Sequence, residues 1–420
     1  SGLHISIIGM CIFRLFSKIR IPGFISAPLS VVIMICYYFM TGMSTSTFRA
    51  VCMFAIMLGA LMLRRSYDIL TALAVAAASL VISNPYILMY AGFWLSFLAV
   101  LGISVFIKAV CISEDKFIVP DWINRKCKKY ILKAVNGLIS GMSISFFTLP
   151  IVLLYYYEFP LYSILINLLV IPLMTVLLVL AIVAGILSYI GLGIGARIIG
   201  MPCTIILWLY KNICAFVRNL PGNHLVFGRP ETGRIVVFYI LVLLIVGLFN
   251  IEIRLKKKSG KVRKGKVVYI AKNILHHRIL INIFLMIFAV LVLMPYKHGL
   301  NIIMIDVGQG DGILMYTSRA VYMIDGGSSS VSKLTDYKLE PCIKSQGVSC
   351  IDYWFISHPD MDHISGLVDI LGDDTMYGMK IKNIVLPGSG TINDDARELI
   401  ELARTQGVNV CLITRGDEIS

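Results

Sequence analysis

Long apolar runs, separated by short polar connections, fill the first 296 residues of the chain. A helix needs about 20 apolar residues to cross the hydrocarbon core of a bilayer, and most of the runs approach that length. The pattern therefore predicts a polytopic α-helical membrane domain over residues 1–296. The expected spans are 1–13, where the run begins with the chain itself, 24–40, 49–63, 69–83, 86–110, 131–155, 162–190, 198–217, 235–250 and 279–296.

A different rhythm begins at residue 301, where short β-rich runs are broken by glycines. Two strands with a tight connection are expected in NIIMIDVGQGDGILMY and RAVYMIDGG. A helix opens at HISGLVDIL, and an amphipathic helix over 394–407 ends at Gly407. Strands that alternate with helices indicate an α/β layered soluble domain over residues 301–420. Its further strands are expected at 352–357, 382–388 and 408–414.

The composition agrees with this division into two domains. Hydrophobic residues make up 58% of the chain and the mean hydropathy is +0.83, whereas soluble domains are about 45–50% apolar. The chain starts inside an apolar run without an initiator Met and stops inside a fold that is still being built, so we expect a fragment of a longer protein. The ten cysteines are expected to be free thiols, and Cys342 with Cys350 is the one pair to test for a disulfide.

The net charge of +14 would suit a nucleic-acid binder, but the placement of the charges favours a topology signal. Basic residues gather on alternate connections, which the positive-inside rule assigns to the cytoplasm. The stretch 254–278, with ten Lys or Arg and no acid, falls on the same side; a docking site for nucleic acid or a partner is its alternative reading. The span at 279–296 then carries the chain out, so the soluble domain is expected to be extracytoplasmic.

The segment SHPDMDHISG (357–366) concentrates side chains that bind metals. Because Pro359 turns the chain after the strand at 352–357, these side chains are expected to gather at the end of a strand rather than along a helix. Imidazole and carboxylate suit Zn²⁺, Mn²⁺ or Fe²⁺, and two ions about 3.5–4 Å apart would activate a water for hydrolysis. We predict a metal site, with a surface acidic loop as the alternative. The ligands are His358, Asp360, Asp362 and His363.

Three further aspartates end or follow strands upstream. Asp325 in MIDGG precedes two glycines that let the backbone approach another group closely, so it is a candidate ligand or a residue that supports the ligands, with a turn residue as the alternative. Asp306 and Asp311 in IDVGQGD have a similar context, and a turn or structural role is favoured for both.

The motif SHPDMDHISGL resembles the metal motif of the metallo-β-lactamase superfamily, and IDVGQGD resembles the form found in ComEC competence proteins, the DNA-uptake channels of transformable bacteria. The apolar half is similar to the same family. The similar segments are SGLHISIIG at the start, the stretch 48–103 with Arg49, Arg65, Asp68, Pro85 and GFWLS, and INLLVIPL with Asn167 and Pro172.

The resemblance implies a partial metallo-β-lactamase-like αββα fold for the soluble domain. The complete fold has two halves, and its further His and Asp ligands come from the second half, which we expect this sequence not to include. It also implies a soluble N-terminal domain before the first residue. Two departures stand out: Trp94 replaces an expected Gln, and Asp360 replaces the His of the commoner HxHxDH, a change that ComEC-type members share and that favours Mn²⁺ over Zn²⁺. With half a site, the chain as given is expected to bind metal weakly and to turn over nothing.

Polar residues in apolar spans are costly and mark pathways or helix contacts. His4 and Asn167 are candidates for lining a substrate pathway, with hydrogen bonds at helix ends or between helices as the alternative. Pro172 suggests a kinked or discontinuous helix.

The implied function is inward transport of single-stranded DNA during natural competence, with metal-dependent hydrolysis of the other strand. Asp362, His363 and Asp325 are the expected catalytic residues, and one or two ions, Mn²⁺ or Zn²⁺, the expected cofactors. Membrane lipid, other competence proteins and a second copy of the chain are the further expected partners. Two alternatives stay open: a membrane-tethered metallohydrolase of small esters or lipids, and a transport protein with a catalytically silent scaffold domain.

Overall fold

The computed structural model describes residues 2–110, 125–259, 287–294, 299–373, 375–388 and 394–418. The chain divides into two compact units, and each is described by itself. One unit consists of 1–151, 160–223 and 243–275, and the other of 152–159, 224–242 and 276–420. The second unit therefore contains, besides the predicted soluble domain, the end of one apolar helix and the beginning of another. The predicted domain boundary at residues 296–301 stays a prediction.

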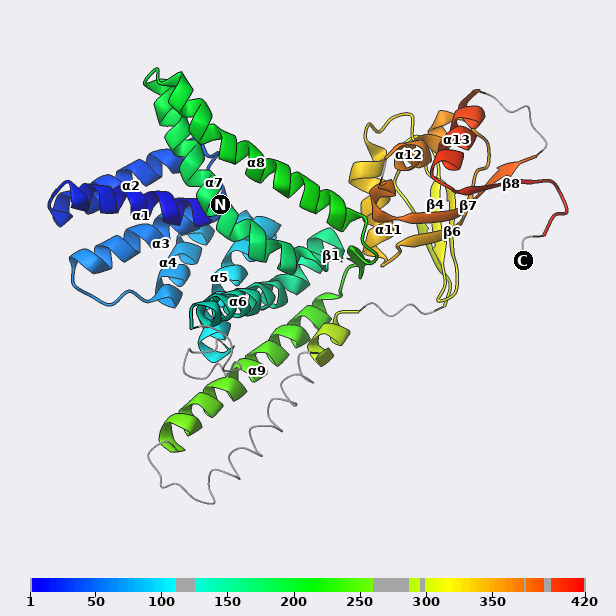
Figure 1. The fold of residues 1–420 in the computed structure, drawn as a ribbon. Helices are drawn as coiled ribbons and strands as arrows, with labels where there is room; N and C mark the ends of the chain where they lie inside the picture. The colour runs from blue at the N-terminus through cyan, green and yellow to red at the C-terminus, as the bar shows by residue number, and fades with distance from the viewer. Residues whose placement is uncertain are drawn as a thin grey trace. The chain divides into compact units, whose positions relative to one another are not determined.

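The N-terminal half is helical, as the apolar pattern predicted (Figure 1). Five of the described helices, α2, α3, α6, α7 and α8, are long and apolar enough to cross a membrane. The helices are α1 (Gly2–Lys18), α2 (Gly23–Met40), α3 (Thr45–Met62), α4 (Ile69–Ser83), α5 (Ala91–Val110), α6 (Arg125–Tyr156), α7 (Ser163–Tyr189), α8 (Gly193–Arg218) and α9 (Thr232–Ser259).

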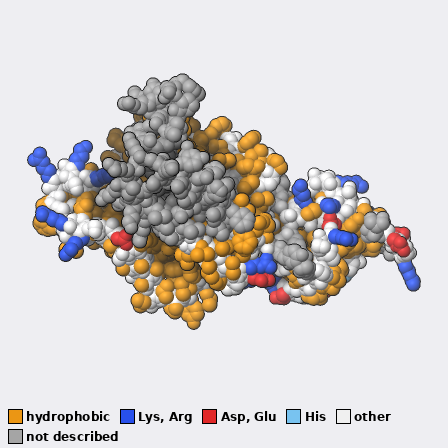
Figure 2. All heavy atoms as spheres, turned by 90° about the horizontal axis from the view of Figure 1, so that it is seen from below, with side chains coloured by type: hydrophobic (Ala, Val, Ile, Leu, Met, Phe, Trp, Pro, Cys, Tyr) orange, Lys and Arg blue, Asp and Glu red, His pale blue; other side chains and the backbone are white. Residues whose placement is uncertain are grey.

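The apolar surface of these helices fits a lipid environment. None of the side chains of α7 is buried, and Figure 2 shows apolar side chains over much of the described surface that it draws. Such a surface is unusual in water and ordinary in lipid. Inside the first unit, small clusters such as Ile5, Met34 and Phe54 still pack helix against helix.

The ends of the helices differ from the expected spans by up to nine residues, and one expected span is divided. The expected span 86–110 is divided, because Asn84 caps a short 3₁₀ turn (Pro85–Met89) before α5 begins. α7 runs without a break across Pro172, so this proline does not divide the helix into two. Of the span at 279–296, residues 287–292 are helical, and residues 279–286 and 295–296 lie outside the described residues.

A six-stranded mixed sheet organises the second unit. The strands lie in the order β3-β4-β5-β6-β7-β8, with β3, β4 and β5 antiparallel and β5 to β8 parallel. The run NIIMIDVGQGDGILMY forms two strands instead of the expected one, because its glycine-rich middle turns the chain back. The strands are β3 (Asn301–Met304), β4 (Gly312–Tyr316), β5 (Val321–Asp325), β6 (Cys350–Phe355), β7 (Lys380–Pro387) and β8 (Asn409–Ile413).

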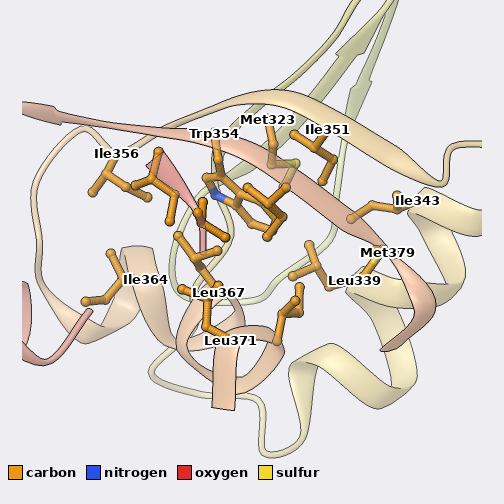
Figure 3. Packing of buried hydrophobic residues seen from close by; sticks show 14 of the residues in the cluster. Met323, Leu339, Ile343, Ile351, Trp354, Ile356, Ile364, Leu367, Leu371 and Met379 are labelled. Atoms are coloured by element: carbon orange, nitrogen blue, oxygen red, sulfur yellow. The ribbon is translucent and has the colours of Figure 1, made fainter. Parts of the chain in front are cut away.

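Each parallel connection carries a helix, namely α11 (Glu340–Ser345), α12 (Met361–Gly372) and α13 (Asp394–Thr405). Because the parallel strands follow one another in a single direction and such crossovers are right-handed, the helices come to one face of the sheet. Their apolar sides pack there around the fully buried Trp354, together with Met323, Leu367 and Leu371 (Figure 3). Sequence reading had missed α11 and a π-helical turn before it (Thr335–Leu339).

Candidate metal centre

The segment SHPDMDH connects β6 to α12 at the carboxyl end of the strand. Asp360 precedes the helix, and its carbonyl oxygen accepts hydrogen bonds from the backbone N–H groups of His363 (2.8 Å) and Ile364 (3.1 Å). α12 therefore begins at Met361, two residues earlier than expected, so Asp362 and His363 lie in its first turn. The cluster lies at a strand's end, as predicted, but part of it is helical.

Three of the predicted ligands converge. His358, Asp362 and His363 each offer a ligand atom, and these atoms lie within 4.8 Å of one another. The His363 Nε2 atom is 3.8 Å from the carboxylate of Asp362, and the two imidazole rings have centroids 3.8 Å apart. His358 and Asp362 are accessible to solvent while His363 is buried. The cluster is therefore open to solvent on one side and packed against the protein at His363.

Asp325 lies behind His363, at the end of the neighbouring parallel strand. Its carboxylate is buried and accepts hydrogen bonds from Ser357 N (2.8 Å), Ser357 Oγ (2.7 Å) and His363 Nδ1 (3.1 Å). A carboxylate that accepts from Nδ1 directs the Nε2 lone pair away from itself, which is how ligating histidines are oriented in metal sites. Ser357 is the residue that sequence reading missed, although it stands directly before His358.

Asp311 joins the same centre through a different loop. Its carboxylate, that of Asp325 and a His363 nitrogen lie within 4.8 Å of one another, although a turn or structural role had been favoured for Asp311. Asp306, in contrast, is in neither group; its carboxylate accepts a hydrogen bond from Lys338 (2.9 Å), which lowers the pKa of Asp306.

Glycines bring the three chain segments of the centre into contact. A Cβ on Gly327 would lie 2.5 Å from the carbonyl carbons of Asp362 and His363. Gly310 has a φ of +147°, and a Cβ there would overlap the backbone oxygens of Asp362 and Gly327. The loops after β3 and β5 thus touch the first turn of α12 backbone to backbone, which only glycine allows.

Asp360 is the predicted ligand that stands apart. Its carboxylate is 3.8 Å from His358 Nε2 but belongs to neither group of converging ligand atoms among the described residues. It remains close enough to His358 that its role as a ligand stays a prediction.

The donor set fits a divalent cation. Two imidazoles and several carboxylates gather there, and in the described ion pairs Asp325 and Asp362 face histidines rather than Lys or Arg. Oxygen and nitrogen ligands of this kind suit Mn²⁺ or Zn²⁺. His358, Asp362 and His363 would hold such an ion, with Asp311 beside them.

Comparison with known proteins assigns the family. The competence protein family model matches residues 1–251, more than half of the chain. The chain belongs to the competence protein family. It is 24% identical to ComE operon protein 3 of Bacillus subtilis, over 99% of this chain and 50% of that protein. It is 22% identical to Recombination protein 2 of Haemophilus influenzae, over 88% of this chain and 48% of that protein. The chain spans about half the length of these relatives, and no solved structure matches it significantly.

Membership of the competence protein family and the apolar helices identify a multi-pass membrane protein. Within the stretch 48–103, Arg49, Asp68 and Trp94 have structural partners. Arg49 is buried and donates from Nε to Ser96 Oγ (2.7 Å), and Asp68 caps α4 by accepting from Thr71 N (2.8 Å). Trp94, the departure from the expected Gln, donates from Nε1 to the carbonyl oxygen of Leu88 (2.7 Å).

The two pathway candidates remain predictions. Asn167 lies on α7 with its side chain exposed in this chain. His4 lies in α1, and its side chain is outside the described part of the structure. Cys342 and Cys350, both among the described residues, are free thiols, so the disulfide considered for this pair is not formed in the structure.

Proposed function

We propose that this competence protein moves single-stranded DNA across the cytoplasmic membrane, and that its C-terminal domain is a metal-dependent hydrolase of the strand that is not transported. The observation that carries the hydrolase is the convergence of His358, Asp362 and His363, backed by the buried Asp325, at the carboxyl ends of two adjacent parallel strands. Ligand sites of α/β sheets are found at such strand ends.

Each residue has a distinct role in this proposal. Bound divalent ions would supply Lewis acidity at the phosphodiester and lower the pKa of a water. Asp362, at the accessible edge of the cluster, orients that water by hydrogen bonding. Asp325 keeps a proton on His363 Nδ1, so that Nε2 faces outward as a lone pair. His358 and Asp360 would complete the set of metal ligands at the solvent-exposed side of the cluster.

The fold of the C-terminal domain supports this proposal. One mixed sheet with helices on one face is the arrangement of one half of a metallo-β-lactamase-like αββα domain, and the relatives are about twice as long as this chain. We propose that the further ligands come from a second half. The loop charges favour an extracytoplasmic position for the domain.

Single-stranded DNA is the proposed substrate and cargo, with His4 and Asn167 along its path. Lipid, other competence proteins and a second copy of the chain are the proposed partners. A steep fall of DNA affinity with salt concentration would support phosphate contacts.

The test is Asp362→Ala in the gene that encodes this chain, with Asp394→Ala as the control. Asp394 has a side chain that is 99% exposed, on α13, and is not in the cluster. The proposal expects Asp362→Ala to abolish Mn²⁺- or Zn²⁺-dependent cleavage of DNA and to reduce transformation, while the control changes neither. Transformation that survives without cleavage would support a scaffold domain instead. Loss of ester hydrolysis with DNA left uncut by the wild type would support the small-substrate hydrolase.

A further inference from the structure

Two connections between apolar helices meet in a small two-stranded sheet, the β1–β2 sheet. β1 (Glu158–Pro160) follows α6, β2 (His224–Val226) precedes α9, and the two strands pair. The backbone N–H groups of Phe227 and Gly228 both donate to the carbonyl oxygen of Tyr157, at 2.9 and 3.0 Å. Residues 152–159 and 224–242 form one compact unit with the C-terminal domain.

A buried lysine of the C-terminal domain reaches the β1–β2 sheet. The Nζ atom of Lys344, on α11, lies 2.7 Å from Glu340 of its own helix and 2.9 Å from Glu158 of β1. The Lys344 side chain is only 6% exposed. A buried ammonium is costly unless it is paired, so the second carboxylate, from 186 positions earlier in the chain, completes its environment.

The backbones of the two segments also touch beside this ion pair. The N–H of Arg229 donates to the carbonyl oxygen of Ser345 (2.7 Å). Ser345 ends α11, and the last carbonyl groups of a helix lack partners within it. The N–H of Arg229, three residues after β2, therefore satisfies one of these carbonyl groups. A Cβ on Gly228 would lie 2.7 Å from the Gly347 nitrogen, and such a close approach needs glycine.

We propose that the β1–β2 sheet, with residues 227–229 that follow it, is the docking site of the C-terminal domain and that Lys344 is the positioning residue that holds the domain on it. The domain that carries the metal cluster is then fixed to the end of α6 and the beginning of α9, in addition to its attachment through the chain that precedes β3. A topological consequence follows: residues 157–159, 224–231 and 301–418 share one side of the membrane. The proposal does not depend on whether the domain hydrolyses DNA.

The loop charges support this placement independently. The basic residues lie on or next to alternate connections: Arg64 and Arg65 follow α3, and Arg197 lies near the start of α8. The connections at 157–162 and 219–231 are the intervening ones, and they fall on the same side as the C-terminal domain by that count.

The docking is tested by a disulfide between Arg229→Cys and Ser345→Cys in the full chain in native membranes. The short N···O contact brings these two positions into the range of about 4.4–6.8 Å that the Cα atoms of disulfides occupy. Cys342→Ser is included, because the native thiol lies one turn from residue 345. A protease site inserted between residues 260 and 275 then reports the bond, since cross-linked halves stay together on a non-reducing gel. The single-cysteine variants are the background.

The proposal expects efficient bond formation in the pair and, with Lys344→Gln or Glu158→Gln, a rate that falls by about tenfold or more. Lys344→Arg keeps the charge and should recover part of the rate. Lys382→Gln is the matched control, because Lys382 pairs with Asp352 (2.7 Å) inside the domain, and it should leave the rate within about twofold. Absence of the disulfide above background overturns the docking. A disulfide whose rate ignores both charge variants overturns the role of Lys344.

Discussion

Replacing Asp325 by Asn separates the structural role of this residue from its proposed role at the candidate metal centre. Asp325 has a φ of +51°, a left-handed conformation that Asn adopts as readily as Asp. The amide keeps one oxygen, which can still accept from Ser357 N. Its NH₂ group replaces the oxygen that accepts from Ser357 Oγ and His363 Nδ1.

The new donor forces His363 to change tautomer. With Nδ1 as an acceptor, the ring proton moves to Nε2, the atom that faces Asp362 and would bind the ion. The substitution replaces hydrogen bonds to a charged carboxylate by neutral ones, so the loss of stability should be about 1–3 kcal/mol. Metal affinity should fall about 10- to 100-fold, as it does when the partner of a ligating histidine is lost.

Titration calorimetry with Mn²⁺ and Zn²⁺, together with thermal unfolding in detergent, checks this prediction. The matched control is Asp352→Asn. Asp352 also accepts from a backbone N–H, that of Val321 (2.8 Å), but it is not in the metal cluster. The control should lose stability without losing metal affinity. If Asp325→Asn binds both ions as tightly as the wild type, the tautomer argument is wrong.

Three further predictions concern packing and pH. Gly327→Ala should cost about 1–3 kcal/mol of stability and weaken metal binding, because its Cβ would meet the backbone of Asp362; Gly372→Ala, with nothing within 4 Å, should stay within about 0.5 kcal/mol by the same unfolding assay. Trp354→Phe should cost about 1–3 kcal/mol, since it removes the Nε1 donor to the Asp325 carbonyl oxygen (2.9 Å); an unchanged melting temperature would contradict this. Burial raises the pKa of Asp352, but hydrogen bonds from Lys382 and Val321 outweigh it and lower the pKa overall. The contribution of Asp352 is therefore present above its unfolded pKa of about 3.9 and lost as the pH falls through the lower folded value, so the melting-temperature difference between wild type and Asp352→Asn should shrink in acid.

The convergence of His358, Asp362 and His363 could be anticipated because these residues are neighbours in the chain. Once a strand is expected at 352–357 and Pro359 follows, the side chains of residues 358 to 363 start close together, although the Asp360 carboxylate lies outside the converging group. Asp311 was less accessible to such reasoning. Its approach to His363 depends on Gly310 and Gly327 closing two loops on α12, a contact that no local pattern encodes.

Contacts between distant parts of the chain are even harder to predict in the helical half and at the β1–β2 sheet. Apolar length predicts that a helix exists, so most spans were found, but it does not show that Asn84 divides one of them by capping a 3₁₀ turn. The pairing of Glu158 with Lys344 joins residues 186 positions apart, and either residue alone reads as an ordinary surface charge.

Asp325 connects the hydrophobic core to the candidate metal centre. Its carbonyl oxygen accepts from Trp354 in the core, while its carboxylate holds Ser357 and His363. The position of His363 therefore depends on how Trp354 packs between the sheet and α12. Core substitutions that leave every ligand in place should still disturb the site, and their effect on metal affinity should follow the displacement of Asp325 rather than the total loss of stability.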